Sequence, residues 1–535
     1  MEEGKRETSG ALWTAIIGIW GLATGVLIVR LLPDILRSPA TAFLVACLSF
    51  FVLSGVFNLV VNVASHFLKD EAPPASRPGD PAVAVFYCTY NDFDRRAGES
   101  LLGLTYPNAR IWILDDSRDA RVRDEVDAFA RDAAGVGRPV EVVRRPARRG
   151  YKAGAINDAL HRLPPEVRYV AIVDSDELVV PDFIQGCLRH FVREDIGFVQ
   201  ANHTCYNRGA SWFTGALGIG VDLHWRHYQR YRDRYGTVNM LGHGAVVRRD
   251  VLERVGGFPE VTCEDIAFTV TARIAGYRGA FAADVVCGET FPEDFAAMRR
   301  RHLRWSWATI EFLRRFSLPF LRSRARWYEK LDLLLPSVNL PATLLLLAFL
   351  GTVQGISWAD GDLSVFRDPV VIALGVFTSV APLAMFVDLW RRPRFAIKVV
   401  VLNTLAYLAL FPVSVVGVLR GLVRPAEFLV TPKGATGAIA LRRAASESRL
   451  EVAFGAGLLA LGAGAFGPWG LVSPLAIAPL LAPLLMTRSR RSLNRTRTAG
   501  GTPPAPGSVP PWPDGGRTAA PMQSARGSTP PANAR

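Results

Sequence analysis

Long apolar segments alternate with one large polar region along the 535-residue chain. The segments that are nearly free of charge are residues 11–29, 40–65, 333–356, 369–387, 399–419 and 452–487. A helix needs about 20 predominantly apolar residues to cross a bilayer, so these segments predict a membrane protein. Residues 70–330, between the second and third segments, have ordinary charge density and are numerous enough to form a domain with its own core.

Basic residues beside the apolar segments predict which side of the membrane each loop faces. Three clusters are rich in Lys and Arg and should lie in the cytoplasm: residues 391–398, 420–449 and 488–497. The acidic loop 357–368 should lie outside. The first two clusters can share one side only if residues 399–419 do not cross the membrane, and Pro412 interrupts that segment. We therefore expect a broken helix over 395–424 that lies at the cytoplasmic face or re-enters it.

The last apolar segment, 452–487, is long enough for two short spans joined by a turn at Gly467-Pro468-Trp469-Gly470. Together with the earlier segments this predicts two spans before the polar region and four after it. Both termini and the polar region would then be cytoplasmic.

The net charge of +14 does not indicate a nucleic-acid-binding protein, because the basic residues are not gathered on one domain. Eight Arg and one Asp fall in the last 48 residues, a Pro/Gly/Ser/Thr-rich tail that we expect to be disordered. Many others lie in short loops beside apolar segments, where anionic lipid headgroups explain them. The six cysteines have neither C-x-x-C nor zinc spacing, so free thiols in a reducing compartment are expected.

Within the polar region, short β-type segments alternate with helical ones. The β-type segments are residues 83–92, 110–117, 140–145 and 169–177. This alternation predicts a parallel sheet with helices on both faces, in which ligands bind beyond the carboxyl ends of the strands. Three of the four segments end in Asp or Asn-Asp, so we expect these side chains to converge on one edge of the sheet.

The last of these strands ends in Asp174-Ser175-Asp176-Glu177, which places three carboxylates within four residues. Like charges this close repel, so either water solvates them in an ordinary loop or a cation binds there. Carboxylates at a sheet edge suit Mg²⁺ or Mn²⁺, which prefer oxygen ligands and share phosphate oxygens. We expect Asp174 and Asp176 to face such an ion and Glu177 to be solvated.

Eight motifs in this order and spacing resemble the processive family 2 glycosyltransferases, which include the cellulose, chitin and hyaluronan synthases. They are "TYND" (89–92), "DDS" (115–117), "YKAGAIN" (151–157), "DSD" (174–176), "LGHGAVVRRDVLERVGGF" (241–258), "VTCEDIAFTVTARIAGYRGAF" (261–281), "RHLRW" (301–305) and "FLVTPKG" (428–434). The resemblance covers roughly 80–435. A D-x-D sequence alone is common by chance, whereas the ordered series is specific.

The resemblance implies a GT-A (Rossmann-like) α/β catalytic domain in the cytoplasm, inserted between transmembrane helices. It implies that Asp115 and Asp116 hold the uridine of a UDP-sugar donor and that Lys152 lies near the nucleotide. Asp174 and Asp176 would bind the diphosphate through Mg²⁺ or Mn²⁺. Each of these positions matches a motif residue of the family.

The same resemblance assigns the acceptor side of the reaction. Asp265 would be the general base that deprotonates the acceptor hydroxyl, and Arg304 and Trp305 would bind the acceptor. Thr431 and Lys433 would belong to a gating loop that closes over the bound nucleotide. A base opposite a metal-bound leaving group suits a single displacement with inversion.

Two positions depart from the family pattern: Arg301 replaces the Gln of Q-x-x-R-W, and Cys263 replaces the Thr of T-E-D. Arg301 would add a cation at the acceptor site, which leaves chain length and acceptor identity open. Alternative interpretations also remain: Glu264 and Asp265 could be an acidic pair favoured by a helix N-terminus. Trp307 is expected to be a membrane-interface anchor.

The sequence thus favours a transferase in the inner or plasma membrane that extends a β-linked polysaccharide and passes it outward. A transferase that adds one sugar to a lipid-linked acceptor is the second hypothesis. A transporter or sensor that binds nucleotide-sugar without turnover is the third, and it would not need Asp265 beside the D-x-D. The expected organisation is two spans (1–69), the catalytic domain (70–298), interface helices with the R-W motif (299–330), two spans (331–390), an interfacial helix and gating loop (391–449), two spans (450–487) and a disordered tail (488–535).

Overall fold

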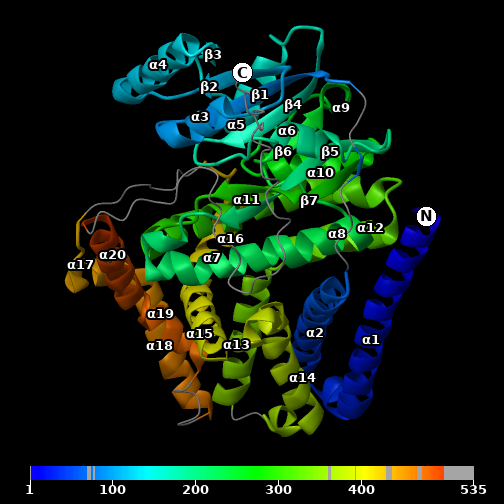
Figure 1. Cartoon of the computed structure of the whole chain (residues 1–535). Helices are drawn as coiled ribbons and strands as arrows, with labels where there is room; N and C mark the ends of the chain where they lie inside the picture. The colour runs from blue at the N-terminus through cyan, green and yellow to red at the C-terminus, as the bar shows by residue number, and fades with distance from the viewer. Residues whose placement is uncertain are drawn as a thin grey trace, which may run out of the picture.

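The computed structural model describes residues 2–68, 74–75, 79–359, 363–391, 393–428, 437–466 and 473–498. An α/β domain forms one end of the molecule, and long apolar helices form the other (Figure 1). Several helices lie crosswise between these two parts, among them α7 (Trp212–His224) and α11 (Phe295–Arg322).

The α/β domain is built on a seven-stranded sheet with the order β3-β2-β1-β4-β6-β5-β7. The strands are β1 (Ala82–Thr89), β2 (Ala109–Asp115), β3 (Val140–Val143), β4 (Val167–Asp174), β5 (Ile196–Cys205), β6 (Ala245–Arg248) and β7 (Arg278–Glu289). The first four are the predicted strands, and they are parallel as expected. β6 runs antiparallel to both β4 and β5, so the sheet is mixed.

Both faces of the sheet are covered because alternate residues of the same strand enter different cores. Val83, Val85 and Tyr87 of β1 pack with α3 (Arg95–Leu102), α4 (Ala120–Gly135) and α6 (Phe183–Leu188). Ala84 and Phe86 pack on the opposite face with α5 (Tyr151–Leu160), α9 (Arg249–Val255) and α10 (Glu264–Ile274). Two-sided burial explains why these strands read as continuous apolar runs rather than as alternating ones.

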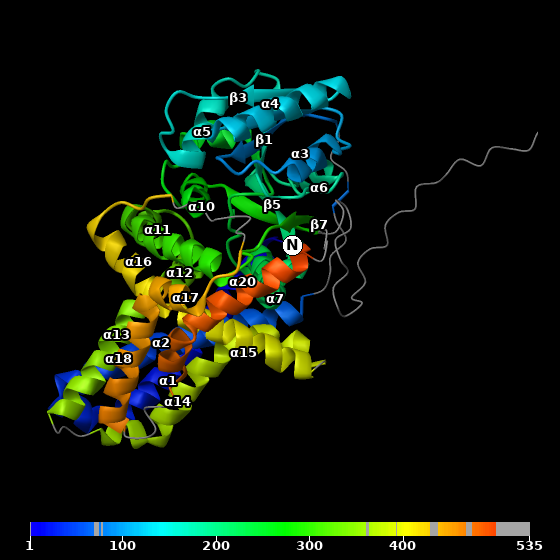
Figure 2. The same ribbon diagram turned by 90° about the vertical axis from the view of Figure 1, so that its left-hand side faces the viewer.

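The helices between the two parts hold the sheet domain against the apolar end (Figures 1 and 2). α7 continues through a π-helical turn, η2 (Trp225–Gln229), into α8 (Arg230–Tyr235), and a short 3₁₀ turn, η1 (Arg208–Ala210), precedes it. α11 packs against α16 (Phe411–Val423), and α12 (Trp327–Ser337) follows it. Gly417 and Gly421 allow this close packing, because a Cβ at either position would lie 2.6 Å from Ser306 or Ile310.

The prediction that Trp307 anchors the membrane interface is wrong. Its side chain is 1 % exposed, lies between α11 and α16, and donates from Nε1 to the Arg424 carbonyl at 3.1 Å. The Arg424 guanidinium lies 4.8 Å from the ring. Trp307 is therefore a packing residue of this helix pair.

Three described helices are long and apolar enough to cross a membrane: Thr8–Arg37 within α1 (Glu2–Arg37), α2 (Pro39–His66) and Pro369–Arg391. The last comprises α14 (Pro369–Val380) and the 3₁₀ segment η4 (Ala381–Arg391), and η3 (Ser364–Arg367) precedes it. Two bent pairs raise the number to five if each is one span: α12 with α13 (Ala342–Trp358), bent by 64°, and α15 (Pro393–Ala409) with α16, bent by 40°.

The predicted broken helix over 395–424 is confirmed as a break between α15 and α16 beside Pro412. Arg30, at the apolar end, pairs with Asp368 at 2.7 Å, so this basic residue lies beside the acidic loop that was expected outside. Basic residues are expected mainly on the cytoplasmic side, and the ion pair with Asp368 accounts for Arg30 on the other side.

The C-terminal helices differ from the prediction. They are α17 (Leu441–Glu447), α18 (Arg449–Phe466), α19 (Pro474–Leu480) and α20 (Ala482–Thr498). α18 begins with charged residues and α19 is only seven residues long, and neither is among the candidate spans. Residues 488–498 are helical rather than disordered, and Arg490 pairs with Asp294 at the start of α11. The predicted turn at 467–470 lies outside the described residues.

Candidate active site

The carboxyl ends of β1, β2 and β4 meet at one edge of the sheet. Thr89 of β1 is level with Asp115 of β2, and Cys88 of β1 is level with Asp174 of β4. The Asp-rich segments that follow these strands are therefore neighbours, as the sequence predicts. Ser175 ties two of them together, because its hydroxyl donates to Asp92 at 2.6 Å.

Asp115 and Asp116 each meet an arginine that sequence reasoning did not single out. Asp115 is 2 % exposed; it accepts from the Ser117 amide at 2.9 Å and from Arg144 Nε at 2.7 Å. Asp116 accepts from Arg145 at both oxygens, at 2.8 and 2.6 Å. The signal that could have found these residues is the basic run "RRPARRG" (144–150), which follows the third strand directly.

Arg148 forms the centre of an aromatic cluster at the same edge. Its guanidinium carbon lies 3.6 Å from the ring centre of Tyr90, 5.1 Å from that of Tyr151 and 5.4 Å from that of Phe428. Burial lowers the pKa of Arg148, although neighbouring groups oppose the shift. Flat guanidinium and aromatic surfaces of this kind can stack on a planar ring. Phe428 brings the start of the predicted gating segment to the site, whereas Thr431 and Lys433 lie outside the described residues.

Lys152 connects the two halves of the site. It begins α5 and donates from Nζ to Asp174 Oδ1 and, at 2.7 Å, to the carbonyl of Gly242. Burial alone would lower the pKa of Lys152, but the Asp174 carboxylate raises it above its ordinary value. Burial would likewise raise the pKa of Asp174, but Lys152 and His243 lower it. Each partner thus favours the charged form of the other, and the Asp174 side chain is still 37 % exposed.

Gly154 lets the first turn of α5 pack closely against the loop that precedes it. A Cβ at position 154 would lie 1.9 Å from the Arg149 carbonyl, so the loop before α5 folds over the helix only with glycine there. Arg145 holds that loop by donating to the carbonyls of Arg149 and Tyr151, each at 2.6 Å. The "YKAGAIN" motif thus positions Lys152 through backbone geometry.

Glu177 is not solvated, which corrects the prediction. It is 1 % exposed; its Oε1 lies 2.6 Å from His203 Nε2, and its Oε2 accepts from the amides of Gly244 at 3.0 Å and Asp174 at 3.2 Å. His243 Nδ1 lies 3.6 Å from the same carboxylate. Burial would raise the pKa of Glu177, but His243 and His203 lower it well below its ordinary range.

The His243 imidazole has two carboxylates as neighbours, Glu177 at 3.6 Å and Glu289 at 3.9 Å. Burial would lower its pKa, but Glu177 and then Asp174 and Glu289 raise the pKa of His243 to about 9. Trp225 closes the cluster by donating from Nε1 to Glu289 at 2.7 Å. His203 and Glu289 come from β5 and β7, far from the motif in sequence, so no local pattern reveals them.

Asp265 lies in the first turn of α10, next to Glu264. A Cβ on Gly242 would lie 3.5 Å from Asp265 Oδ2, so the loop that accepts from Lys152 packs against this carboxylate. Burial and the neighbouring Asp265 charge raise the pKa of Glu264 to about 7, and burial raises the pKa of Asp265. Two carboxylates with raised pKa values at one site are suited to proton transfer near neutral pH.

Arg304 and Trp305 lie on α11, and the Arg304 guanidinium lies 4.8 Å from the ring centre of Phe428. Burial lowers the pKa of Arg304, while the charges of Glu264, Asp174 and Asp265 act in the opposite direction. Trp305 is 37 % exposed. Arg301 stacks on its ring at 4.3 Å and on Phe291 at 4.8 Å. The residue that departs from the family motif thus covers one face of Trp305.

The comparisons with known proteins agree with this architecture. Residues 169–415 match the family described as glycosyl transferase family group 2. The chain is therefore similar to the family 2 glycosyltransferases over this region.

Proteins similar to this chain include plant enzymes. A probable glucomannan 4-β-mannosyltransferase from Oryza sativa subsp. japonica is 28 % identical over 46 % of this chain and 46 % of its own length. Another, probable glucomannan 4-β-mannosyltransferase 15 from Arabidopsis thaliana, is 26 % identical over 52 % of this chain and 56 % of its own. The chain spans about half the length of the curated relatives it matches.

The fold of the family 2 domain matches a solved structure. A mannosyltransferase from Pyrobaculum calidifontis in complex with GDP-Man and Mn²⁺ superposes with a TM-score of 0.50 and 19 % identity, over 71 % of this chain and 99 % of that one. This likeness confirms the GT-A-like mixed α/β domain.

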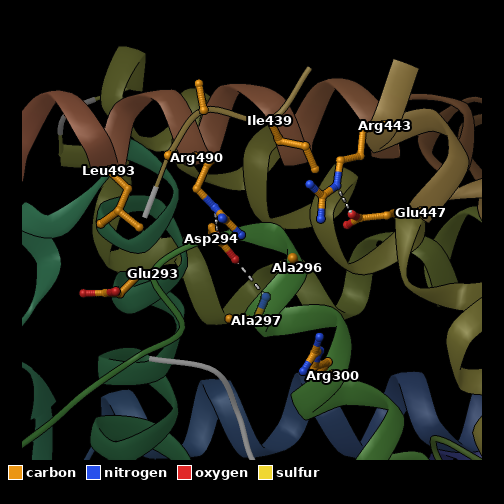
Figure 3. Close-up of a pocket in the computed structure, with 12 residues that line it drawn as sticks. Glu293, Asp294, Ala296, Ala297, Arg300, Ile439, Arg443, Glu447, Arg490 and Leu493 are labelled. Atoms are coloured by element: carbon orange, nitrogen blue, oxygen red, sulfur yellow. Dashed lines mark hydrogen bonds and ion pairs between the residues drawn. The ribbon is translucent and has the colours of Figure 1, made fainter. Parts of the chain in front are cut away.

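A separate cavity of about 320 Å³ lies elsewhere in the molecule, between the start of α11, α17 and α20 (Figure 3). Its charged side chains are largely paired with one another, Asp294 with Arg490 and Arg443 with Glu447. None of the predicted site residues that the structure describes lines it. The strand-end site is therefore identified by its chemistry and not by its volume.

Proposed function

We propose that the protein is a membrane-embedded inverting glycosyltransferase that extends a β-linked polysaccharide from a nucleotide-sugar and passes the product outward. The observation that carries this proposal is the link from Asp174 through Lys152 and Gly242 to Asp265. This link brings the donor end of β4 beside the candidate base. A transporter or sensor without turnover would not need a carboxylate of raised pKa at that position.

The donor that we propose to test first is GDP-mannose. Relatives of the chain are named as glucomannan 4-β-mannosyltransferases, which supports mannosyl transfer to a β-1,4-linked chain. The cluster of Arg148, Tyr90, Tyr151 and Phe428 would stack on the base, and Asp115 and Asp116 would orient the nucleoside. UDP-sugars, which the resemblance to the synthases implies, form the second group to test.

Asp174 and Asp176 fit a divalent cation. They are oxygen donors two residues apart at the end of a strand, and Asp174 is 37 % exposed, so a hard cation such as Mn²⁺ or Mg²⁺ suits them. Such an ion would neutralise charge on the diphosphate leaving group. Thr290 fixes the loop between the strand and α6 by donating to the Asp176 carbonyl at 3.0 Å.

The chain's own residues supply the remaining chemistry. Asp265 would take the proton from the acceptor hydroxyl, because its raised pKa matches this task near neutral pH. Arg304 and Lys152 would offset negative charge that develops on the leaving group. Trp305 would present its uncovered face to the acceptor sugar. A base and a leaving group on opposite sides of the anomeric carbon give inversion.

The membrane arrangement follows from the candidate spans and the location of the donor. Nucleotide-sugars are cytoplasmic, so the sheet edge and the segment with Thr431 and Lys433 should face the cytoplasm, and that segment would close over the nucleotide. Single cysteines at positions 364 and 436 of a cysteine-free protein test this arrangement. An impermeant thiol reagent should label position 364 in intact cells and position 436 only after the cells are opened.

Addition of a single sugar to a lipid-linked acceptor is the second candidate function. The stacking of Arg301 on Trp305 favours it, because the guanidinium occupies an aromatic face on which a longer sugar chain could bind.

Purified full-length protein with a panel of GDP- and UDP-sugars, followed by sizing of the product, tests the proposal. Transfer should stop in EDTA and return with Mn²⁺ or Mg²⁺. Asp176→Asn should reduce turnover by orders of magnitude, whereas Asp158→Asn, which removes an exposed ion pair on α5, should not. Full activity in EDTA would exclude the metal, and binding of donor without any product would favour the sensor.

A further inference from the structure

Two histidines and an aspartate meet where the candidate spans join the crosswise helices. His66 ends α2, His227 lies in the π-helical turn η2, and Asp388 lies in η4. His66 Nε2 is 2.9 Å from Asp388 Oδ1, and His227 Nε2 is 3.3 Å from Asp388 Oδ2. One ligand atom from each residue lies within 4.8 Å of the others. None of the three belongs to the candidate active site.

The hydrogen bonds of the other ring nitrogens define which nitrogen carries the proton in each histidine. His66 Nδ1 lies 2.6 Å from the Asn62 carbonyl, which can only accept. His227 Nδ1 lies 2.7 Å from the Ser65 hydroxyl, whose own proton is donated to the same Asn62 carbonyl at 2.7 Å. Both Nδ1 atoms must therefore donate. Each neutral imidazole consequently points the lone pair of Nε2 at the Asp388 carboxylate.

A proton on one ring would give a single ion pair with Asp388 and leave the lone pair of the other ring facing the carboxylate. Protonating both rings would put two positive charges in a stack only 4.5 Å apart, whereas a divalent cation between the three groups would satisfy all of them. His227 Nε2 and Asp388 Oδ2 are buried and face each other at 3.3 Å without a well-aligned hydrogen bond. Arg226 approaches Asp388 Oδ2 at 3.6 Å, but as a donor it cannot serve as a ligand.

We propose that His66, His227 and Asp388 bind a divalent transition-metal ion, with Zn²⁺ as the best match. Ligand distances of about 2.0–2.2 Å put neighbouring ligand atoms of a tetrahedron roughly 3.3 Å apart, close to the observed separations. Histidines that bind metals commonly donate the other ring N–H to an oxygen, as both do here. A π-helical turn such as η2 is frequently found at functional sites.

The ion would tie together three elements that lie far apart in the sequence. α2 and η4 are parts of candidate spans, whereas η2 belongs to the crosswise helix that packs on the sheet domain. With three protein ligands, the fourth position would hold water. The site would thus fix the apolar helices to the catalytic part, independently of the metal at Asp174 and Asp176.

Co²⁺ binding tests this site, because tetrahedral and octahedral Co²⁺ differ strongly in visible absorption. The protein would be full-length, purified in detergent, freed of any affinity tag and stripped with a chelator, in an Asp176→Asn background that removes the strand-end metal. One equivalent of Co²⁺ should give an intense tetrahedral spectrum, and Zn²⁺ should abolish it. Elemental analysis should find one Zn²⁺ per chain.

Variants locate the binding to these residues. His227→Gln and Asp388→Asn should weaken Zn²⁺ binding at least 100-fold, and Ser65→Ala, which removes a hydrogen bond to a ligand, by about 10-fold. His161→Gln, which changes an exposed histidine at the end of α5, should have no effect. Absence of a tetrahedral Co²⁺ spectrum in the otherwise unchanged protein, or equal Zn²⁺ affinity in all variants, would overturn the proposal.

Discussion

The two halves of the strand-end site differ in how their carboxylates are neutralised. On the side of β2, Asp115 and Asp116 are buried and each forms an ion pair with its own arginine, Arg144 or Arg145. On the side of β4, Lys152 serves Asp174, while Glu264 and Asp265 have raised pKa values. In the first half each carboxylate has its own arginine, whereas in the second half Glu264 and Asp265 form no ion pair within 4 Å with any described residue.

This difference indicates what each half does. Carboxylates already held by arginines serve as fixed positioning groups, because removing either partner would leave a buried charge. Carboxylates that are only partly protonated near neutral pH can bind a cation or accept a proton. We therefore expect changes on the β4 side to alter chemistry, and changes on the β2 side to alter stability and donor binding.

The largest effect is expected for Asp265→Asn. An amide cannot accept the acceptor's proton, so turnover should fall by about 10²–10⁴-fold while donor affinity stays unchanged. Single-turnover kinetics with donor titration measure both quantities. Near-normal transfer by this variant would show that Asp265 only stabilises the start of α10.

The next effect is expected for Arg145→Met, which should act on stability and not on the chemical step. It leaves Asp116, with a side chain 7 % exposed, facing only Arg148 at 3.8 Å. Loss of one partner from a buried pair costs roughly 3–5 kcal/mol, and the remaining Arg148 should keep the loss near the lower limit.

Thermal unfolding and donor binding measure this effect, and Arg149→Met is the matched control, because that arginine is 85 % exposed. In the double variant with Asp116→Asn, part of the lost stability should return, since no charge is then buried. A rate defect with unchanged stability would contradict the division between the two halves.

A smaller effect is expected in the pH dependence. Because Asp265 must be ionised and its pKa is raised, the rate should rise with pH on the acid side of neutrality. Burial is the largest cause of the raised pKa of Asp265, and Glu264, with a pKa of about 7, is mostly uncharged in this range, so Glu264→Gln should leave the pH profile in place. A profile that shifts to lower pH would show that a charge on Glu264 contributes to the raised pKa of Asp265.

The stability of the same pair has the opposite dependence on pH. The folded pKa of Glu264, about 7, lies above its ordinary value of 4.5, so folding favours the protonated form. The stabilisation is present below the ordinary pKa and is lost as the pH rises toward 7. Thermal unfolding at several pH values should show this loss in the unaltered protein and not in Glu264→Gln.

The smallest effect is expected for Arg301→Gln, which restores the family motif. A partly exposed cation–π contact is worth about 0.5–1 kcal/mol, so stability and rate should change little. Product length is the sensitive measurement, because the variant uncovers one face of Trp305. Longer products would support the polysaccharide function, and unchanged single addition would favour a lipid-linked acceptor.

Much of the sheet could be predicted from the sequence because the pattern that indicates each strand lies within that strand's own residues. The four parallel strands and their Asp-rich ends follow from continuous apolar runs with polar termini, and the break near Pro412 follows from proline chemistry. The mixed direction could not be predicted, since β6 is only four residues long and pairs with strands 40 and 70 residues away.

The groups that tune the site could not be predicted because they arrive from distant strands. Glu177 reads as the third charge of an exposed loop, yet His203, on another strand, makes its burial possible. Trp307 reads as an interface anchor, yet α16 covers it from more than 100 residues away. In both cases burial depends on a tertiary partner that the local pattern does not contain.

The close packing of α11 on α16 has a mechanical consequence. With Gly417 and Gly421 against Ser306 and Ile310, the two helices share too little space to slide past each other. Arg304 and Trp305, on α11, must therefore move with α16, whereas Lys152 and Asp174 move with the sheet. Any tilt of the apolar helices relative to the sheet domain would change the distance between the proposed acceptor and donor groups. Under the proposed function, a bilayer around these helices would therefore act on the rate of transfer.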